Sequence, residues 1–71
     1  MKEIYIYLLD EGTDVWRPVQ ALQLDDGFFR IPPNALVPDG EMWEFNPGDI
    51  VRCEDKHLSD GKAALVACEK V

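Results

Sequence analysis

The sequence predicts a small all-β domain, a sandwich or a barrel, and two observations support this prediction. Short runs rich in β-branched and aromatic residues are separated by Gly, Pro, Asp and Asn about every ten residues. No segment of useful length places its apolar residues at helical spacing. Because 71 residues suffice for only one small core, we assign residues 1–71 to a single domain.

The first predicted strand runs from Lys2 to Leu9. Side chains alternate along a strand, so Ile4, Ile6 and Leu8 share one face while tyrosines occupy the other. Both faces are apolar, which suits a strand covered on both sides or one whose tyrosines lie at an interface. Residues 10–14, with three acids and a glycine, are expected to form a solvated loop.

The second predicted strand, from Val15 to Leu24, contains Pro18. Proline cannot donate a ladder hydrogen bond, so Pro18 belongs at an edge or a bulge, as in the bent second strand of a small barrel. Asp26-Gly27 predicts a hairpin turn into a third strand, Phe28 to Ile31. The second and third strands are therefore expected to be antiparallel neighbours.

Three prolines make residues 32–40 irregular, yet Ala35, Leu36 and Val37 at their centre are apolar. This loop either plugs one end of the barrel or offers a surface to a partner. We expect plugging, because small domains need every apolar contact.

Further strands are predicted at Glu41–Phe45 and Ile50–Glu54, on either side of a type II turn, Asn46-Pro47-Gly48-Asp49. The last strand is predicted at Ala63–Val71.

Two details concern the connection before the last strand. A four-residue turn at Ser59–Lys62 would place Cys53 opposite Cys68. His57-Leu58-Ser59 is expected to form at most a short helical turn.

Short strands in this order, with an acidic loop after the first and a proline-bent second, resemble an SH3-like small barrel. The segments Val15–Ala21, Asp25–Gly27 and Phe29–Ile31 are similar to Tudor and related barrels, in which a Trp-containing strand precedes an acid-glycine hairpin. The turn and strand at Pro47–Val51 are also common in such barrels. The resemblance implies a five-stranded, SH3-like antiparallel barrel with at most one short helical turn. Residues 8–19 and 43–54 also resemble short uncharacterised bacterial proteins.

Charge narrows the classes of function. The chain has 14 acidic and 7 basic residues, a formal net charge of −7, and its basic residues are scattered singly. Such a surface repels phosphate backbones and anionic membranes, so neither is expected as a direct partner. The apolar run at the N-terminus is too short for a signal or membrane segment, which indicates a cytoplasmic protein with reduced cysteines.

Cys53, His57 and Cys68 are the soft potential metal ligands, but the set lacks a fourth Cys or His. A disulfide is conceivable, although small core cysteines are favoured. A catalytic thiol would need an orienting group and a substrate pocket, and acids beside turn glycines are solvated. We therefore predict no catalytic, cofactor or metal site, and no enzyme.

The aromatic residues suggest binding. Tudor-type modules hold a methylated cation in an aromatic cage with a nearby acid, although core packing is the commoner role of such residues. We predict a protein-interaction module for a basic partner, with self-association through an exposed edge strand as a variant. The alternative is an acidic inhibitor or immunity-type protein that blocks a basic nuclease or nucleic-acid-binding site. The predicted partner-binding residues are Trp16, Trp43, Leu36, Val37, Asp10, Glu11 and Asp14.

Overall fold

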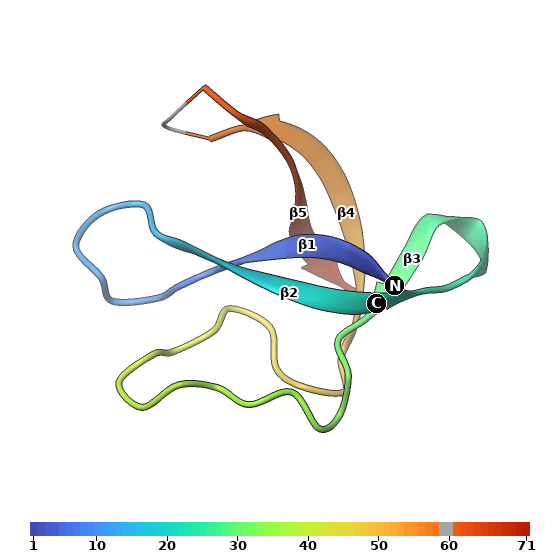
Figure 1. Cartoon of the computed structure of the whole chain (residues 1–71), viewed down its shortest axis with the longest axis horizontal. Coiled ribbons are helices and arrows are strands. Elements are labelled where there is room, and N and C mark those ends of the chain that lie inside the picture. The colour runs from blue at the N-terminus through green and yellow to red at the C-terminus, as the bar shows by residue number, and fades with distance from the viewer. Residues whose placement is uncertain (59–60) are drawn as a thin grey trace.

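The computed structural model describes residues 1–58 and 61–71. Its strands are β1 (Lys2–Tyr7), β2 (Trp16–Gln23), β3 (Phe28–Arg30), β4 (Ile50–His57) and β5 (Ala63–Lys70). They follow one another in chain order around a closed barrel (Figure 1). A single 3-10 turn, Asp25–Gly27, is described beside them, so the all-β prediction is confirmed. Among the described residues, no helix has the length and apolar character needed to cross a bilayer.

The barrel closes between β1 and β5, and this closure is parallel. The pairings β1–β2, β2–β3, β3–β4 and β4–β5 are all antiparallel. Four reversals of direction leave β5 running the same way as β1, so a closed five-stranded meander must have one parallel pairing. The predicted five-stranded antiparallel barrel is confirmed, and its closing pairing, Tyr5 opposite Val66, is parallel.

Beyond Tyr5 the end of β1 leaves β5 and pairs with an irregular segment, residues 42–44. Leu8 forms an isolated antiparallel bridge with Trp43, and the Leu9 amide donates to the Met42 carbonyl at 2.7 Å. The Glu44 amide donates to the Tyr7 carbonyl at 2.9 Å. This segment takes the place of β5 as the pairing partner of the end of β1.

The predicted strand at Glu41–Phe45 is therefore wrong, because only the bridge at Trp43 is present. A turn immediately before it, closed by a 3.1 Å hydrogen bond from the Glu41 amide to the Pro38 carbonyl, limits the extended stretch. Trp43 and Phe45 are both buried in the barrel. The apolar character of this segment reflects core filling and not a continuous ladder.

The interior is built from alternate residues of the strands. Ile4, Ile6, Ile31 and Val51 are fully buried, and the isoleucine face of β1 points inward. The tyrosines on the opposite face of β1 are half-buried. β1 therefore presents its apolar face to the core and its aromatic hydroxyl face to the surface.

Both predicted tight turns are present. The Leu24 amide donates to the Phe28 carbonyl at 2.8 Å and closes the β2–β3 hairpin. The Asp49 amide donates to the Asn46 carbonyl at 3.0 Å, and Gly48 between them has φ of 92°. That positive φ is what a type II turn requires at its third position, and it explains the glycine.

The β4–β5 hairpin differs from the prediction in three ways. β4 continues to His57, which pairs with Ala63, so His57 is in a strand and not in a helical turn. The register set at the turn pairs His57 with Ala63, so Cys53 lies opposite Ala67 and not Cys68, and a β-bulge follows between Arg52 and Cys53. Both cysteines are free thiols. Ser59 lies outside the described residues, and so does the first half of the turn predicted at residues 59–62.

The 32–40 loop plugs the barrel only in part. Ala35 packs against the core, but Leu36 is 89% exposed and Val37 is 37% exposed. The expectation that all three apolar residues plug the barrel was wrong, because Ala35 alone faces the interior.

Candidate functional site

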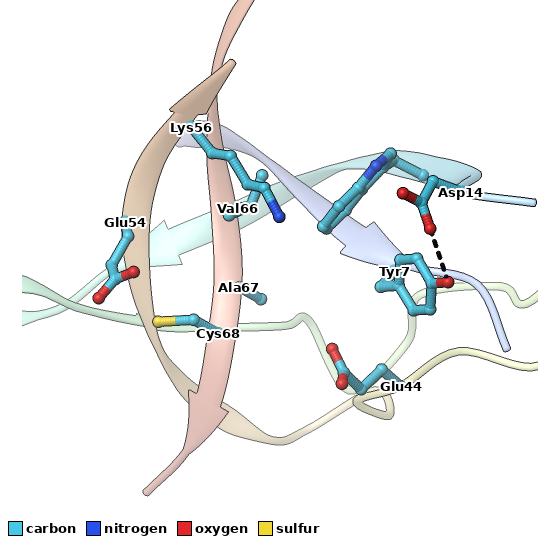
Figure 2. A pocket seen from close by; sticks show the side chains of 9 residues that line it. Tyr7, Asp14, Glu44, Glu54, Lys56, Val66, Ala67 and Cys68 are labelled. Atoms are coloured by element: carbon cyan, nitrogen blue, oxygen red, sulfur yellow. Dashed lines mark hydrogen bonds between the residues drawn. The ribbon is translucent and has the colours of Figure 1, made fainter. Parts of the chain in front are cut away.

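A hollow of about 270 Å³ opens where β1 and β5 separate. It lies just beyond the Tyr5–Val66 pair, between the end of β1, the start of β2 and the β4–β5 hairpin (Figure 2). The residues around it are Tyr7, Asp14, Trp16, Glu44, Glu54, Lys56, Val66, Ala67 and Cys68. Its position follows from the parallel closure, because the single pair leaves room on either side.

Two aromatic rings form one wall of the hollow. Tyr7 and Trp16 are directly opposite in the β1–β2 ladder and lie on the face away from the isoleucine core. Their ring centroids are 5.1 Å apart with an interplanar angle of 70°, an edge-to-face arrangement. The strand ladder therefore fixes the relative position of these two rings.

A cation already lies on this wall. The Lys56 Nζ of β4 is 5.4 Å from the centroid of the Trp16 ring. A cation within about 6 Å of a tryptophan centroid is attracted by the negative face of the ring. The lysine side chain extends from β4 across the hollow (Figure 2).

Carboxylates surround the aromatic wall. The Tyr7 hydroxyl donates to Asp14 Oδ1 at 3.0 Å, and this bond, together with the negative charge of Asp14, raises the pKa of Tyr7. The charge of Glu44 contributes in the same direction. Figure 2 shows the Glu44 carboxylate and Asp14 on the same side of the hollow as Tyr7. This side of the hollow is therefore electronegative.

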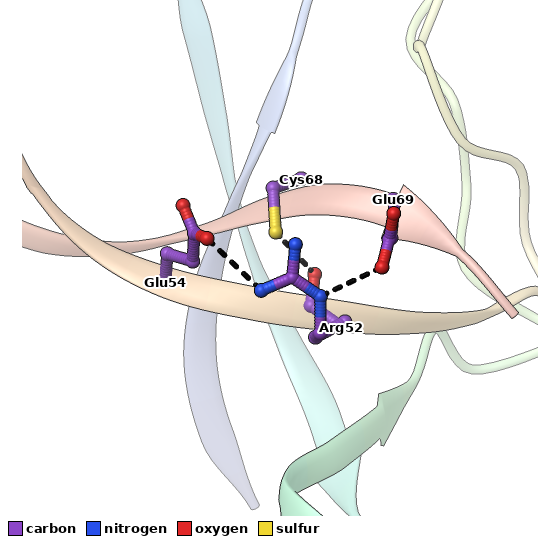
Figure 3. Close-up of polar contacts among 4 residues, drawn as sticks. All are labelled: Arg52, Glu54, Cys68 and Glu69. Atoms are coloured by element: carbon purple, nitrogen blue, oxygen red, sulfur yellow. Dashed lines mark hydrogen bonds and ion pairs between the residues drawn. The ribbon is translucent and has the colours of Figure 1, made fainter.

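On the opposite side of the hollow, the charge of Glu54 is offset in part by Arg52. Arg52 Nη1 lies 2.9 Å from Glu54 Oε1, and its Nε lies 2.8 Å from Glu69 Oε1 (Figure 3). The hydrogen bond to Glu69 and then that to Glu54 raise the pKa of Arg52. The negative charge available to a ligand therefore comes from Asp14 and Glu44.

The cysteine in the hollow is poorly suited to nucleophilic chemistry. The Cys68 thiol donates to the Arg52 carbonyl at 3.2 Å (Figure 3), and desolvation raises its pKa. Desolvation also raises the pKa of Cys53 to about 11. Thiols with raised pKa values are protonated at neutral pH and react slowly. Within residues 1–58 and 61–71, no three Cys, His, Asp or Glu residues cluster as metal ligands.

A carboxylate clamp holds the segment that carries Glu44. Arg17 forms a bidentate pair with Glu41, through its Nε at 3.1 Å from Oε1 and through its Nη2 to Oε2. The Trp43 indole donates to the same Oε1 at 3.0 Å. The hydrogen bonds from Arg17 and then Trp43 lower the pKa of Glu41. This clamp ties residues 41–43 to β2 and so positions one wall of the hollow.

The structure brings together only part of the predicted contact set. Trp16 and Asp14 line the hollow, whereas Leu36 and Val37 are exposed but do not line it. Asp10 and Glu11 are exposed in the loop that precedes Asp14.

Trp43 is only 7% exposed and packs in the core, so its prediction as an exposed anchor was wrong. Its buried ring fills the barrel, and its indole nitrogen is used by the clamp.

Sequence reasoning missed Tyr7, Glu44 and Lys56 as site residues. A signal for Tyr7 existed, since strand alternation places it on the outer face and a β1–β2 hairpin places it beside Trp16. Glu44 and Lys56 carried no such signal, because they reach the hollow from segments brought together only by barrel closure.

A larger hollow of about 580 Å³ lies on the other side of the Tyr5–Val66 pair. Its charged lining residues are two lysines and two acids: Lys2, Lys62, Glu3 and Asp55. Equal numbers of opposite charges give no preference for a cationic or an anionic ligand. The first hollow has the more defined chemistry.

No protein family model, curated protein or solved structure matches this chain. The function must therefore be argued from the chemistry of the site.

Proposed function

We propose that this chain is a small, non-enzymatic interaction module for a basic protein partner. The hollow beside Tyr7 and Trp16 would receive an ammonium group from the partner. The observation that carries the proposal is the Lys56 ammonium, which lies 5.4 Å from the Trp16 centroid in a hollow also lined by Asp14 and Glu44. The site already holds a cation of the proposed kind.

Three physical features support cation binding there. The faces of aromatic rings attract ammonium groups, with an energy of about 0.5–2 kcal/mol depending on desolvation. The carboxylates of Asp14 and Glu44 add direct charge attraction. The net charge of −7 favours encounter with basic partners over long range. A single ammonium side chain of the partner would bind weakly in this hollow, so a stable complex requires further contacts from the partner.

The likeness to SH3-like and Tudor-type barrels belongs to this proposal. It is supported by the ring of five short strands and by a second strand that carries both Trp16 and Pro18. The Tudor resemblance implies a methylated ammonium as ligand. We further propose a cytoplasmic location and, as a variant, self-association through a strand edge.

One observation favours the second candidate function, an acidic inhibitor of a basic nuclease or nucleic-acid-binding site. The 8–15 loop carries Asp10, Glu11 and Asp14, and a 2.7 Å hydrogen bond between Leu9 and Met42 joins it to the segment that carries Asp39 and Glu44. Acids on two joined segments offer negative charges that can stand in for phosphates. Inhibition of a basic ribonuclease, lost on substitution of Asp10 and Asp39 by lysine, would favour this candidate.

A peptide titration followed by 1H–15N NMR tests the main proposal. The probes are capped pentapeptides with central lysine, trimethyllysine or glutamine between glycines. We expect the two cationic peptides to shift the Trp16 indole and the Tyr7 and Glu44 amides, and the glutamine peptide to leave them unchanged.

The matched variants are Asp14→Asn and Asp39→Asn, which remove the same charge inside and outside the hollow. Only Asp14→Asn should weaken binding strongly. Equal weakening by both variants, or shifts as large with the glutamine peptide, would contradict a specific cation site.

A further inference from the structure

We infer that Lys56 is an internal competitor for the pocket, so that a partner's ammonium group binds by displacing it from Trp16. This inference rests on the proposed function and adds to it the residue that limits affinity. The proposal follows from where the Lys56 ammonium lies, what holds it there and what the neighbouring charges favour.

The position of the side chain is set by the barrel. Lys56 lies in β4 opposite Ala64 of β5, whereas Trp16 begins β2, on the other side of the β1–β5 closure. The lysine chain spans the hollow and places Nζ 5.4 Å from the Trp16 centroid (Figure 2). An incoming ammonium that uses the same ring face must take the same place.

The contact that holds Lys56 is a weak one. Lys56 is exposed, and a cation–π contact at an exposed site is at the low end of the range for such contacts. Glu54, two residues earlier on the same strand, is ion paired with Arg52 at 2.9 Å. A flexible lysine held in this way exchanges readily between bound and free positions, so it competes with a ligand and does not block it.

The opposite role, in which Lys56 is a counter-ion for an anionic ligand, is disfavoured by its neighbours. Asp14 and Glu44 line the same hollow and would repel a carboxylate or phosphate. The aromatic ring face repels anions as well. The two carboxylates and the Trp16 ring favour a positive charge, and the Lys56 ammonium supplies it when no partner is bound.

The size of the effect follows from the strength of the internal contact. A cation–π contact at an exposed site corresponds to an occupied-to-free ratio of about two to five. Because a ligand binds only the free form, removal of the competitor should tighten binding about three- to sixfold.

The test compares Lys56→Gln with Lys2→Gln, using the capped lysine pentapeptide and a dissociation constant from NMR titration. Lys2 lies in the other hollow, so its substitution removes the same charge without touching the pocket. We expect Lys56→Gln to tighten binding about three- to sixfold and Lys2→Gln to change it much less. Lys56→Arg, which keeps a cation on the ring, should bind as the wild type does.

An equal effect of Lys2→Gln would assign the gain to net charge and overturn the inference. Weaker binding by Lys56→Gln would make Lys56 a ligand contact and also overturn it.

A second readout is independent of ligand affinity. The ε-methylene protons of Lys56 should be shifted upfield by the Trp16 ring in the free protein and should return downfield on saturation with peptide. If no variant binds any cationic peptide, the proposed function fails and the inference with it. If the wild type and Lys56→Gln bind equally and the ε-methylene protons do not move, only the inference fails.

Discussion

Replacing each tryptophan by alanine should separate folding from binding, because the two rings have different environments. Trp43 is 7% exposed and packs against the core cluster, whereas Trp16 is half-buried on the outer face of β2. Truncation of a buried tryptophan to alanine costs about 3–5 kcal/mol. A domain of 71 residues has a total unfolding free energy of about 4–10 kcal/mol, so Trp43→Ala should remove a large part of it.

The loss expected for Trp16→Ala is smaller. It removes the edge-to-face contact with Tyr7, worth about 0.5–1.5 kcal/mol, and the burial of half a ring. We expect a total loss of about 1–2 kcal/mol, which leaves the domain folded. Binding of the capped lysine peptide should nevertheless be lost, because the cation-binding ring face is gone.

Urea unfolding followed by far-UV circular dichroism measures both losses without relying on tryptophan fluorescence. With a denaturant slope of about 1–1.5 kcal/mol per molar, the midpoint should fall by about 2–5 M for Trp43→Ala and about 0.7–2 M for Trp16→Ala. If Trp43→Ala has no folded baseline, Trp43→Phe keeps the aromatic volume and should fold and bind peptide. The reasoning is refuted if folded Trp16→Ala binds normally, or if Trp43→Phe folds but loses binding.

Three further predictions follow. The hydrogen bonds from Arg17 lower the pKa of Glu41 below its ordinary value of 4.5, so they stabilise the fold above pH 4.5 and are lost as the pH falls through the lowered pKa. In thermal melts, Glu41→Gln should therefore be less stable than the wild type at neutral pH. The variant should also lose less stability than the wild type as the pH falls below 4.5. Gly48→Ala should lower the free energy of unfolding by about 1–2 kcal/mol, measured by calorimetry, because the residue has a φ of 92°. The added Cβ would lie 4.0 Å from Pro33, so no clash contributes to this loss. An unchanged melting temperature would contradict a strained turn. Iodoacetamide at neutral pH should modify both thiols slowly, and Cys53, which packs against the core, more slowly than Cys68, as seen by mass spectrometry; the cationic peptide should protect Cys68, and faster labelling of Cys53 than of Cys68 would contradict this order.

Local patterns predicted the elements of the fold well where neighbouring residues decide the conformation. The alternation in β1, the β2–β3 hairpin at Asp26-Gly27 and the turn at Gly48 depend on side chains and backbone angles close in sequence. The segment around Trp43 was misread as a strand because buried apolar residues in a loop and in a short strand have the same composition.

The site was predicted only at Trp16 and Asp14. Trp43 has the same residue type as Trp16, and only the packing distinguishes a core ring from a surface ring. Lys56 and Glu44 belong to no recognisable sequence motif. Their shared hollow exists because β1 and β5 meet at one pair and then separate.

The sequence by itself determined the all-β class, the positions of the tight turns, the division of β1 into an isoleucine face and a tyrosine face, and the excess of acidic residues. These are properties of local spacing, of backbone preferences and of summed charge. Only the tertiary structure decided the parallel closure, the hairpin register that places Cys53 opposite Ala67, and the placement of a lysine on a tryptophan ring. Those features depend on register and closure between strands distant in sequence, where a shift of one residue moves every side chain to the other face.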